Sequence, residues 1–490
     1  MGVDPVGLQR LAEVASRTQH VHRTGDAAVT DLHADTRAVT PGSVFVAVRG
    51  STTDGHELAG AAVAAGAVAV VVERPVSVAV PQLVVEDTRR LLGPLAAEVH
   101  GRPADRMTMV GVTGTNGKTT VTHLLAAIVD AAGRSAGVIG TIGARIGGEG
   151  LPIGFTTPEA PELQRLLRRM VDAGVEIVAM EVSSHALELG RVDAITYDVA
   201  AFTNLSQDHL DFHGDMERYY AAKASLFAPA RAREAVVAVD DPWGRRLLGE
   251  ATIPTTTVGF AEDASLGVAE IELTATGGNL TLRGLASFEV SLPLAGAFNA
   301  VNTLVAVGSA LRIGIEPGDI CRGLAAAGPV PGRFERVEAG QGFTVVVDFA
   351  HTPDAIRTVV AAARGLTSGR VIAVGGAGGD RDRAKRPMMG RALASADLAV
   401  ITSDNPRSED PGTIIEEMTA HLASAAPLTV EPDRRRAIAV ALAAARPGDV
   451  VLVLGKGHET GQEAGGVVTP FDDRTVASEE LARLLAGRRR

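Results

Sequence analysis

Hydrophobic positions along the chain fall into short runs rich in valine, isoleucine and alanine, separated by longer amphipathic stretches. Apolar runs of about 4–8 residues bounded by turn residues are typical of buried strands, and the stretches between them follow the helical period. This alternation predicts parallel α/β domains. The strands we expect span residues 44–48, 67–72, 83–85, 107–113, 175–180, 198–202, 344–347, 370–374, 398–401 and 450–454.

Two breaks divide this pattern into three domains. The first lies near residues 101–103, and the second is the Pro-Val-Pro-Gly segment at residues 329–332. A chain of 490 residues also exceeds the size of one hydrophobic core. We predict an N-terminal α/β domain over residues 1–106, a central domain of the P-loop mononucleotide-binding type over residues 107–331, and a C-terminal Rossmann-like domain over residues 332–490.

Within the central domain the pattern is less regular toward its end. Residues 252–294 are rich in β-branched positions but irregular in spacing, which predicts a region of additional strands. Helices are expected to begin near Lys118 and near Phe298.

Composition and charge narrow the class of protein. The net charge of −11 and an aromatic content of 3% argue against a nucleic-acid-binding surface. No apolar run reaches about 18 residues, and Asp4, Arg10 and Glu13 interrupt the N-terminus before a signal peptide develops. The single cysteine, Cys321, excludes an internal disulfide and is expected to be buried. We therefore expect a soluble, cytoplasmic protein with neither a nucleic-acid nor a membrane partner. We also expect a monomer, although composition and charge do not determine the oligomeric state.

Lysine is rare in this chain. Of 47 basic residues only four are lysines: Lys118, Lys223, Lys385 and Lys456. An ammonium is a compact point charge and can lose its proton, which a guanidinium cannot do in a protein. These four lysines are therefore candidates for such chemistry. The alternative is that these four lysines remain by chance and have no special role. This alternative is weakened because three of the four lie in segments with the composition of loops.

A glycine-rich segment follows the strand at residues 107–113 and precedes the helix near Lys118. In that setting backbone N–H groups can hold phosphates, a lysine can reach the outer phosphates, and a threonine can ligate Mg²⁺. The strict P-loop pattern fails at Val112, where glycine is required, and a generic glycine turn is the alternative. We interpret the segment as an ATP phosphate loop formed by Gly114, Thr115, Asn116, Gly117, Lys118, Thr119 and Thr120.

Candidate magnesium ligands follow two later strands. Glu181 comes directly after the strand at 175–180, so its carboxylate is expected at the carboxyl edge of the sheet, beside the phosphate loop. His209 lies in a dense polar cluster, residues 208–213. We interpret His209 as a second magnesium ligand. A zinc site would need a cysteine or a suitably spaced second histidine, which the cluster lacks. The remaining alternative is that the cluster is simply a solvated polar loop.

Two further features have ordinary alternatives. Lys223 lies on an expected helix at residues 219–227, where a lysine is most often a surface residue whose ammonium reaches the solvent. Because lysine is so rare in this chain, we favour a role for Lys223 at the metal site. Ser183 and His185 could be a nucleophile and its base. No G-x-S-x-G elbow surrounds them, so hydrolase chemistry is disfavoured.

Together these motifs resemble the Mur ligases, the ATP-dependent amide-forming enzymes of peptidoglycan precursor synthesis. The similar segments run in the family's order along nearly the whole chain: residues 114–120, 181–185, 203–205, 208–209, Lys223 before 226–227, Gly296 with 298–299 and Asn302, 331–335 and 348–354. The resemblance implies ATP as co-substrate, further contacted by Asn299, Asn302, Arg333 and Asp348. It implies Mg²⁺ held by Thr119, Glu181, His209 and Lys223, with Lys223 carbamoylated into a carboxylate-like ligand. Lys118, His209 and Lys223 are implied as catalytic residues.

Three segments resemble the branch of this family that adds the third residue of the peptide: Asp35-Thr36-Arg37, Thr156-Thr157-Pro158 and Asp404-Asn405-Pro406-Arg407. The first has threonine where serine is usual, and the second also has the composition of a helix N-cap followed by proline. The branch implies UDP-MurNAc-L-Ala-D-Glu as substrate, bound by Thr36, Arg37, Thr156, Thr157, Ser183 and Arg191. It implies UDP binding by the N-terminal domain, ATP binding by the central domain and amino-acid binding by the C-terminal domain.

The identity of the amino acid depends on Arg407. Diaminopimelate carries a second amino-acid centre, whose carboxylate a planar guanidinium can hold bidentately, whereas lysine would present only an ammonium there. The resemblance adds Arg381, Asp404, Asn405, Pro406, Gly455 and Glu459 to this pocket. Two residues depart from the family's pattern. Phe349 stands where the family usually has tyrosine, and Leu189 stands where some relatives have a polar residue that contacts the substrate. Arg383 and Lys385 are either ATP contacts or solvated.

The expected activity is an amide ligation through an acyl phosphate, yielding ADP and phosphate. A folylpolyglutamate-synthetase-like ligase would share the central loop, but the segments at 156–158 and 404–407 argue against it. A generic P-loop NTPase or a nucleotide-regulated binding protein would need only the first loop. Such a protein would not explain the rare lysines or the polar clusters of the other two domains.

Overall fold

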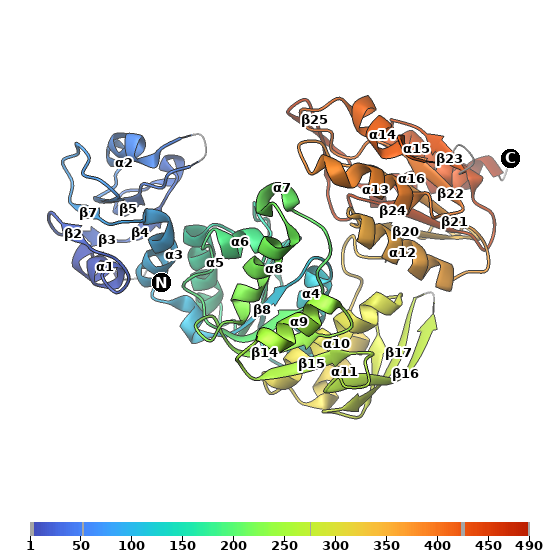
Figure 1. Ribbon diagram of the computed structural model, residues 1–490, viewed down its shortest axis with the longest axis horizontal. Coiled ribbons are helices and arrows are strands. Elements are labelled where there is room, and N and C mark those ends of the chain that lie inside the picture. Colours follow the sequence, from blue (N-terminus) through green and yellow to red (C-terminus); the bar gives the residue numbers. More distant parts are fainter. Residues whose placement is uncertain (1–3, 51–52, 275, 423–426, 489–490) are drawn as a thin grey trace.

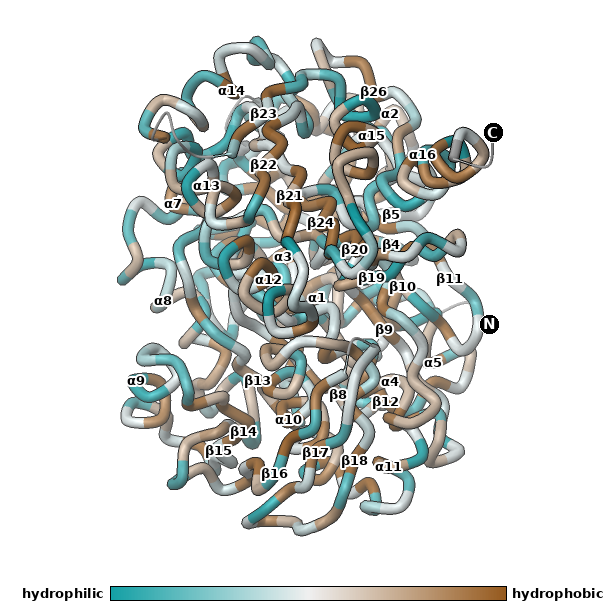
Figure 2. The backbone as a smooth tube through the Cα atoms, turned by 90° about the vertical axis from the view of Figure 1, so that its right-hand side faces the viewer, coloured by the Kyte–Doolittle hydropathy of each residue, from teal (hydrophilic) through white to brown (hydrophobic). Residues whose placement is uncertain are grey.

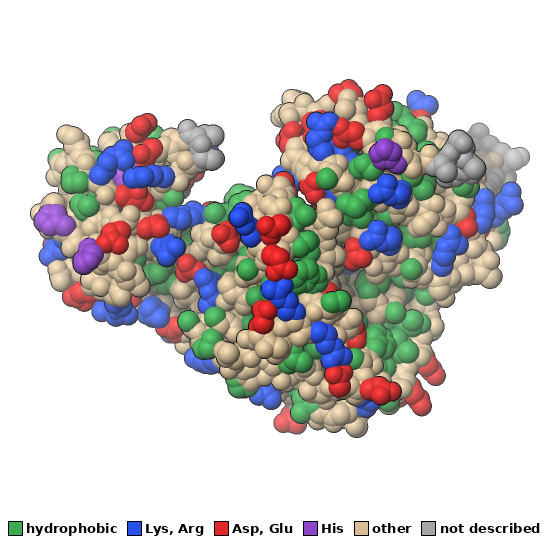
Figure 3. Space-filling model, viewed as in Figure 1, with side chains coloured by type: hydrophobic (Ala, Val, Ile, Leu, Met, Phe, Trp, Pro, Cys, Tyr) green, Lys and Arg blue, Asp and Glu red, His purple; other side chains and the backbone are tan. Residues whose placement is uncertain are grey.

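The structure is a computed structural model that describes residues 4–50, 53–274, 276–422 and 427–488. Its architecture is the predicted one, three α/β domains in a row, with the N-terminal and C-terminal domains on opposite sides of the central one (Figure 1). Acidic and basic side chains are interspersed over the face in Figure 3. No helix among the described residues is both long and apolar enough to cross a membrane.

The N-terminal domain is built on a five-stranded sheet in the order β2-β7-β6-β5-β4, parallel except for β2. Its strands are β2 (His22–Arg23), β4 (Asp31–His33), β5 (Ser43–Val46), β6 (Ala69–Val72) and β7 (Gln82–Val84), beside a ribbon of β1 (Val6–Gly7) and β3 (Ala28–Val29). Its helices are α1 (Leu8–Ala15), α2 (Ala59–Ala64) and α3 (Thr88–Val99), with 3₁₀ turns η1 (Thr36–Ala38), η2 (Gly55–Leu58) and η3 (Pro103–Arg106).

The central domain has an 11-stranded sheet in the order β11-β10-β9-β12-β8-β13-β14-β15-β16-β17-β18. The strands from β9 to β16 in this order are parallel, and the two ends are antiparallel. Their bounds are β8 (Thr108–Thr113), β9 (Ala136–Gly140), β10 (Gly143–Ile146), β11 (Glu149–Leu151), β12 (Ile177–Glu181), β13 (Tyr197–Phe202), β14 (Ala232–Ala238), β15 (Thr255–Gly259), β16 (Leu266–Thr274), β17 (Gly277–Gly284) and β18 (Glu289–Leu292). The strand-rich region predicted at 252–294 is therefore confirmed as β15–β18.

The helices described in the central domain are α4 (Lys118–Ala131), α5 (Ala160–Asp172), α6 (Ser184–Glu188), α7 (Leu210–His213), α8 (Met216–Ala224), α9 (Pro242–Glu250), α10 (Ala297–Arg312) and α11 (Pro317–Ala326). The helix starts predicted near Lys118 and Phe298 are confirmed by α4 and α10. The helix predicted at 219–227 ends earlier, because its last three residues tighten into the 3₁₀ turn η4 (Ser225–Phe227).

The C-terminal domain has a six-stranded sheet in the order β19-β20-β24-β21-β22-β23, parallel except for β19. Its strands are β19 (Glu335–Arg336), β20 (Thr344–Asp348), β21 (Val371–Gly375), β22 (Leu398–Ile401), β23 (Leu428–Val430) and β24 (Val450–Leu454), with a separate hairpin of β25 (Gly461–Ala464) and β26 (Val467–Pro470). Its helices are α12 (Pro353–Gly365), α13 (Arg386–Leu393), α14 (Pro411–Thr419), α15 (Arg434–Ala444) and α16 (Asp473–Arg488), plus the 3₁₀ turn η5 (Arg383–Lys385).

The inner strands are apolar on both faces because helices cover both sides of each parallel sheet. Figure 2 shows this as hydrophobic colour along β20, β21 and β24, and every residue of β21 and β24 is buried. Cys321 differs from the prediction: it lies on α11 and is only partly buried, with its sulfur 3.3 Å from the carbonyl oxygen of Glu289. The carboxyl ends of the two parallel sheets turn toward the same space, where ligands of α/β proteins bind.

Candidate active site

A cavity of about 740 Å³ lies where the central and C-terminal domains meet. Loops after β8, β12 and β13 line it on the central side, and loops after β20, β21, β22 and β24 line it on the other. The predicted site residues in its wall are Thr115, Asn116, Gly117, Lys118, Thr119, Thr120, Thr156, Glu181, Ser183, His209, Asn299, Asn302, Arg333, Asp348, Arg381, Asp404, Asn405, Arg407, Gly455 and Glu459. The structure therefore brings together most of the predicted site residues, although they lie far apart in the sequence.

The phosphate loop connects β8 to the N-terminus of α4, as predicted. Asn204 holds it in shape, because its carbonyl accepts from the Thr115 N–H (2.9 Å) and its side-chain oxygen accepts from the Asn116 N–H (3.0 Å). The Lys118 ammonium donates back to the carbonyls of Gly114 (2.9 Å) and Thr115 (2.8 Å). Burial lowers the pKa of Lys118. An anion at the helix N-terminus would meet this ammonium and the loop amides together.

Gly117 ends the loop with a φ of 88°, in the left-handed region. A Cβ at this position would lie 2.2 Å from the side-chain oxygen of Asn302 on α10. Asn302 in turn donates to the Asn299 side chain (3.0 Å), and both asparagines are buried. The close approach of α10 to the loop therefore requires glycine here.

Lys223 is 2% exposed, so the interpretation as a surface lysine is wrong. Its amine donates to the Gly114 carbonyl (2.8 Å) and lies 4.7 Å from the centre of the Tyr219 ring. Burial, reinforced by the positive charge of Lys118, lowers the pKa of Lys223 well below its usual value. The surroundings of Lys223 therefore shift its equilibrium away from the ammonium and toward the amine, beside the phosphate loop.

Two other predicted metal ligands, Glu181 and His209, line the cavity together with this loop. Glu181 is 1% exposed and accepts from both the backbone N–H (2.8 Å) and the hydroxyl (3.0 Å) of Thr141. His209 has a φ of 53°, and burial lowers its pKa to about 3, so the imidazole is neutral at pH 7. Within the described parts of the chain, no three His, Cys, Asp or Glu side chains converge closely enough to hold a metal ion by themselves.

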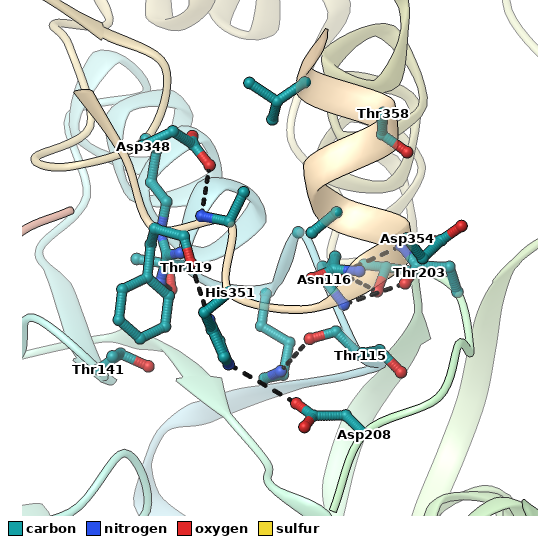
Figure 4. A pocket seen from close by; sticks show the side chains of 18 of the residues that line it. Thr115, Asn116, Thr119, Thr141, Thr203, Asp208, Asp348, His351, Asp354 and Thr358 are labelled. Atoms are coloured by element: carbon teal, nitrogen blue, oxygen red, sulfur yellow. Dashed lines mark hydrogen bonds and ion pairs between the residues drawn. The ribbon is translucent and has the colours of Figure 1, made fainter. Parts of the chain in front are cut away.

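Contacts between the two domains cross the cavity. Asp208 of the central domain lies 3.3 Å from the Lys385 ammonium and 3.7 Å from the His351 ring, and Figure 4 shows Asp208 and His351 facing each other. Burial opposes ionisation of Asp208, but the hydrogen bond from His351 and the nearby positive charges hold its pKa well below the usual value. Lys385 is buried in this contact and is therefore not solvated, whereas Arg383 pairs with Glu417 at the surface.

Arg333 joins the interdomain linker to the phosphate loop. Its guanidinium donates to the Thr119 hydroxyl (2.9 Å) and lies 4.5 Å from the centre of the Phe349 ring. Asp348, at the end of β20, accepts from the N–H groups of Phe334 (2.7 Å) and Ala350 (2.8 Å), and burial raises its pKa. Both residues therefore lie where the linker meets the cavity.

The pocket predicted for the amino acid lies at the carboxyl ends of β22 and β24. Arg407 has a φ of 52° and donates to the Gly379 carbonyl (2.7 Å). The Asn405 side chain donates to Glu459 (2.8 Å). Gly455 lies so close to Asp404 that a Cβ added to Gly455 would be 2.5 Å from the Asp404 carboxylate. Arg381 and these residues line the cavity, while Pro406 lies behind the wall in a smaller pocket.

The predicted muramoyl-binding residues divide into two groups. Thr156 and Ser183 line the cavity, whereas Thr157 and Arg191 support it: the buried Thr157 hydroxyl donates to the Glu181 carbonyl (2.8 Å), and Arg191 donates to the Thr157 carbonyl (3.1 Å). The helix N-cap suggested at 156–158 is wrong, because α5 is preceded by Glu159 and has its proline one turn later.

Thr36 and Arg37 are not brought to the cavity. They lie in η1 of the N-terminal domain, where the Arg37 guanidinium is mostly exposed and pairs with Asp35 at 2.6 Å. Sequence reasoning also missed Thr141, the partner of Glu181, because one threonine between two strands carries no signal. Asn204 and His351 lie inside the similar segments, but their contacts depend on how distant segments pack.

Comparison with known protein families covers most of the chain. The Mur ligase middle domain matches residues 112–310, the Mur ligase glutamate ligase domain matches residues 332–457, and the Mur ligase family catalytic domain matches residues 29–100. The chain belongs to the Mur ligase family. It is accordingly an ATP-dependent ligase of peptidoglycan precursor synthesis.

Individual Mur ligases are similar over nearly their full length. A UDP-N-acetylmuramoyl-L-alanyl-D-glutamate–2,6-diaminopimelate ligase of Geobacillus thermodenitrificans is 48% identical, covering 93% of this chain and 96% of the relative. The enzyme of the same name from Streptomyces coelicolor is 46% identical, covering 96% of each. A solved structure with this name is 33% identical, covers 94% of this chain and 96% of its own, and has a TM-score of 0.67.

Proposed function

We propose that this Mur ligase adds diaminopimelate to UDP-MurNAc-L-Ala-D-Glu with consumption of ATP. The observation that carries the proposal is the single cavity in which the phosphate loop and the pocket around Arg407 face the same space. The similar enzymes from Geobacillus thermodenitrificans and Streptomyces coelicolor, which are named for this reaction, support the choice of substrates. We also assign the enzyme to the cytoplasm, where these precursors are made, and expect it to act as a monomer.

The reaction proceeds in two displacements. A carboxylate oxygen of the D-Glu residue attacks the γ-phosphorus of ATP, and the bond between that phosphorus and the bridging oxygen breaks to release ADP. The amine nitrogen of diaminopimelate then attacks the acyl carbon, and the carbon–oxygen bond to phosphate breaks. The nitrogen loses one proton, which balances as the proton of the released inorganic phosphate, and an amide remains. Lys118 and the loop amides offset the charge of the two anions that meet in the first step.

Mg²⁺ would fit the donor set at this site. Magnesium takes oxygen ligands, and one or two protein carboxylates suffice when phosphates and water complete the shell. Thr119, Glu181, His209 and a carbamoylated Lys223 would hold it, and it would neutralise phosphate charge. The lowered pKa of Lys223 supports carbamoylation, because the deprotonated amine has a nitrogen lone pair that can form a bond to the carbon of CO₂ with loss of one proton.

Each of the three domains would bind a different substrate or part of a substrate. Residues 1–106, with Thr36 and Arg37, would bind the UDP end, and Thr156, Thr157, Ser183 and Arg191 would hold the muramoyl dipeptide. Residues 107–331 would bind ATP, with Asn299, Asn302, Arg333 and Asp348 around the nucleotide. Residues 332–490 would bind the amino acid. Polar contacts such as that of Asp208 with Lys385 support closure of the last two domains around the acyl phosphate.

Arg407 would select the amino acid. Its guanidinium lines the cavity and can pair bidentately with the distal carboxylate of diaminopimelate, while Glu459 can pair with the distal amine. L-Lysine lacks that carboxylate and would place an ammonium beside the arginine. Arg381, Asp404, Asn405, Pro406 and Gly455 would complete the pocket.

ADP release measured with each amino acid tests the proposal. Diaminopimelate should support turnover at least 100-fold more efficiently than L-lysine, and Arg407→Met should reduce that ratio to below about tenfold, because a charged hydrogen bond contributes about 1.5–3 kcal/mol. Equal turnover with both amino acids refutes the selection by Arg407. ADP release that needs no amino acid at all would favour a simple NTPase instead.

A second experiment tests the carbamate. Lys223→Ala should be inactive, and small carboxylates such as acetate or propionate should restore part of its activity by occupying the vacated space. Lys118→Ala serves as the control, because a carboxylate cannot replace its positive charge and no rescue is expected. A fully active Lys223→Ala variant, or equal rescue of both variants, would contradict the assignment.

A further inference from the structure

Lys456 is a charged side chain with no exposed surface, and the reaction as described does not use it. It follows β24 at the carboxyl edge of the C-terminal sheet. Its ammonium donates to the side-chain oxygen of Asn405 (2.9 Å) and to Oε2 of Glu459 (2.9 Å). Burying an ammonium costs free energy unless it is paired, and here both partners belong to the pocket around Arg407.

These contacts determine which way the Asn405 amide points. An ammonium can only donate hydrogen bonds, so the amide oxygen must face Lys456. The same oxygen accepts from the Glu463 N–H (3.1 Å), and the amide nitrogen is consequently turned toward Glu459, to whose Oε2 it donates (2.8 Å). Lys456 and Asn405 therefore hold one oxygen of Glu459 between them.

The other carboxylate oxygen of Glu459 remains available. Oε2 receives two hydrogen bonds, whereas Oε1 has no hydrogen bond to any part of the chain that the structure describes. Glu459 lines the cavity, and its side chain is 33% exposed. The arrangement presents one oriented carboxylate oxygen to an amine that enters the pocket.

We propose that Lys456 is a positioning residue that sets the specificity of the amino-acid pocket by orienting Asn405 and Glu459 toward the substrate's amine. The proposal rests on the proposed function, since it assumes that an amino acid binds beside Arg407. Lysine suits this position because its compact ammonium can donate to two closely spaced acceptors within a fully buried site, where a planar guanidinium would need more room.

Lys456→Met tests the proposal, because methionine has nearly the same length and no charge. We expect KM for diaminopimelate to rise about 10- to 100-fold, as for loss of hydrogen bonds to a charged group. KM for ATP and for UDP-MurNAc-L-Ala-D-Glu should stay within about twofold of wild type. In a Glu459→Gln background the same substitution should raise KM less than about threefold further, because both act through one carboxylate.

The control is Arg370→Met, at the opposite end of the same sheet. Arg370 pairs with Asp449 (2.6 Å) away from the cavity, so this variant should lower the melting temperature without changing KM for diaminopimelate. Lys456→Gln is the milder second variant, and the Kd for ADP reports whether each variant keeps its fold. Three outcomes would show that Lys456 is purely structural and would overturn the proposal. They are equal increases of all three KM values, additive effects of Lys456→Met and Glu459→Gln, and loss of ADP binding by both Lys456 variants.

Wild-type turnover separates this inference from the proposed function. If the enzyme accepts L-lysine and not diaminopimelate, the proposed function fails, and the KM comparison is made with L-lysine instead. An unchanged KM for the accepted amino acid in Lys456→Met then refutes the inference alone.

Discussion

Replacing Gly117 by alanine probes the fit between the phosphate loop and α10. The new methyl group would lie 2.2 Å from the side-chain oxygen of Asn302, so Asn302 or the loop must move. The residue would also keep a φ of 88°, which L-residues adopt at a cost of about 1–2 kcal/mol. Displacing Asn302 breaks its hydrogen bond to Asn299, which contributes about 0.5–1.5 kcal/mol.

These two effects together amount to about 1.5–3.5 kcal/mol if the loop relaxes in the free protein and must be restored when nucleotide binds. That corresponds to about 10- to 400-fold weaker binding. The assay is isothermal titration calorimetry with a non-hydrolysable ATP analogue and Mg²⁺. Asn302→Ala removes the obstacle, so Gly117→Ala should cost less than about tenfold in that background.

Gly133→Ala is the matched control for strain alone. Gly133 lies just beyond the other end of α4 with a φ of 72°, and a Cβ there meets no atom within 4 Å. This variant should lower stability by about 1 kcal/mol and leave nucleotide affinity unchanged. Binding by Gly117→Ala within threefold of wild type, or an equal loss in Gly133→Ala, would refute the reasoning.

Three other predictions follow from polar side chains that are wholly or partly buried. Asp473→Asn removes one partner from a fully buried pair with Arg434, so the free energy of unfolding of the C-terminal domain in urea should fall by about 3–5 kcal/mol; a change below 1 kcal/mol contradicts this. Burial lowers the pKa of His209 to about 3, so the unfolded chain binds the extra proton below about pH 6.5. Stability in EDTA should therefore be greatest above that pH and decline toward pH 3, less steeply in His209→Gln. Thr141→Val removes the hydroxyl that donates to Glu181 and should lower kcat/KM for ATP about 10- to 100-fold at unchanged melting temperature; unaltered kinetics would show that Glu181 needs no such support.

The inner strands could be predicted from the sequence because their apolar runs are continuous. Residues 398–401 and 450–454 coincide with β22 and β24, since both faces of these strands are covered by helices. The start of α4 was equally predictable from the glycine loop before Lys118. Local geometry that depends on packing was not: Pro158 suggests a helix start, but α5 begins at Ala160, because Thr157 is instead bonded to the end of β12.

The site shows the same limit. Phosphate-loop residues follow one another in the chain, so their grouping is visible in the sequence. The contact of Asp208 with Lys385 joins residues 177 positions apart, and it depends on how two domains dock. No local sequence pattern encodes how the two domains dock. The sequence alone therefore could not distinguish an ATP contact from a solvated side chain at Lys385.

The scarcity of lysine also has a practical chemical consequence. Three of the four lysines are buried and the fourth, Lys118, is half-buried in the phosphate loop, so no lysine side chain is fully exposed to solvent. Amine-reactive esters, which decorate the surface of most proteins indiscriminately, would here find only the α-amino group and amines in and around one cavity. Modification by such a reagent, followed by mass spectrometry with and without nucleotide, therefore reads occupancy of the cavity directly and with almost no background.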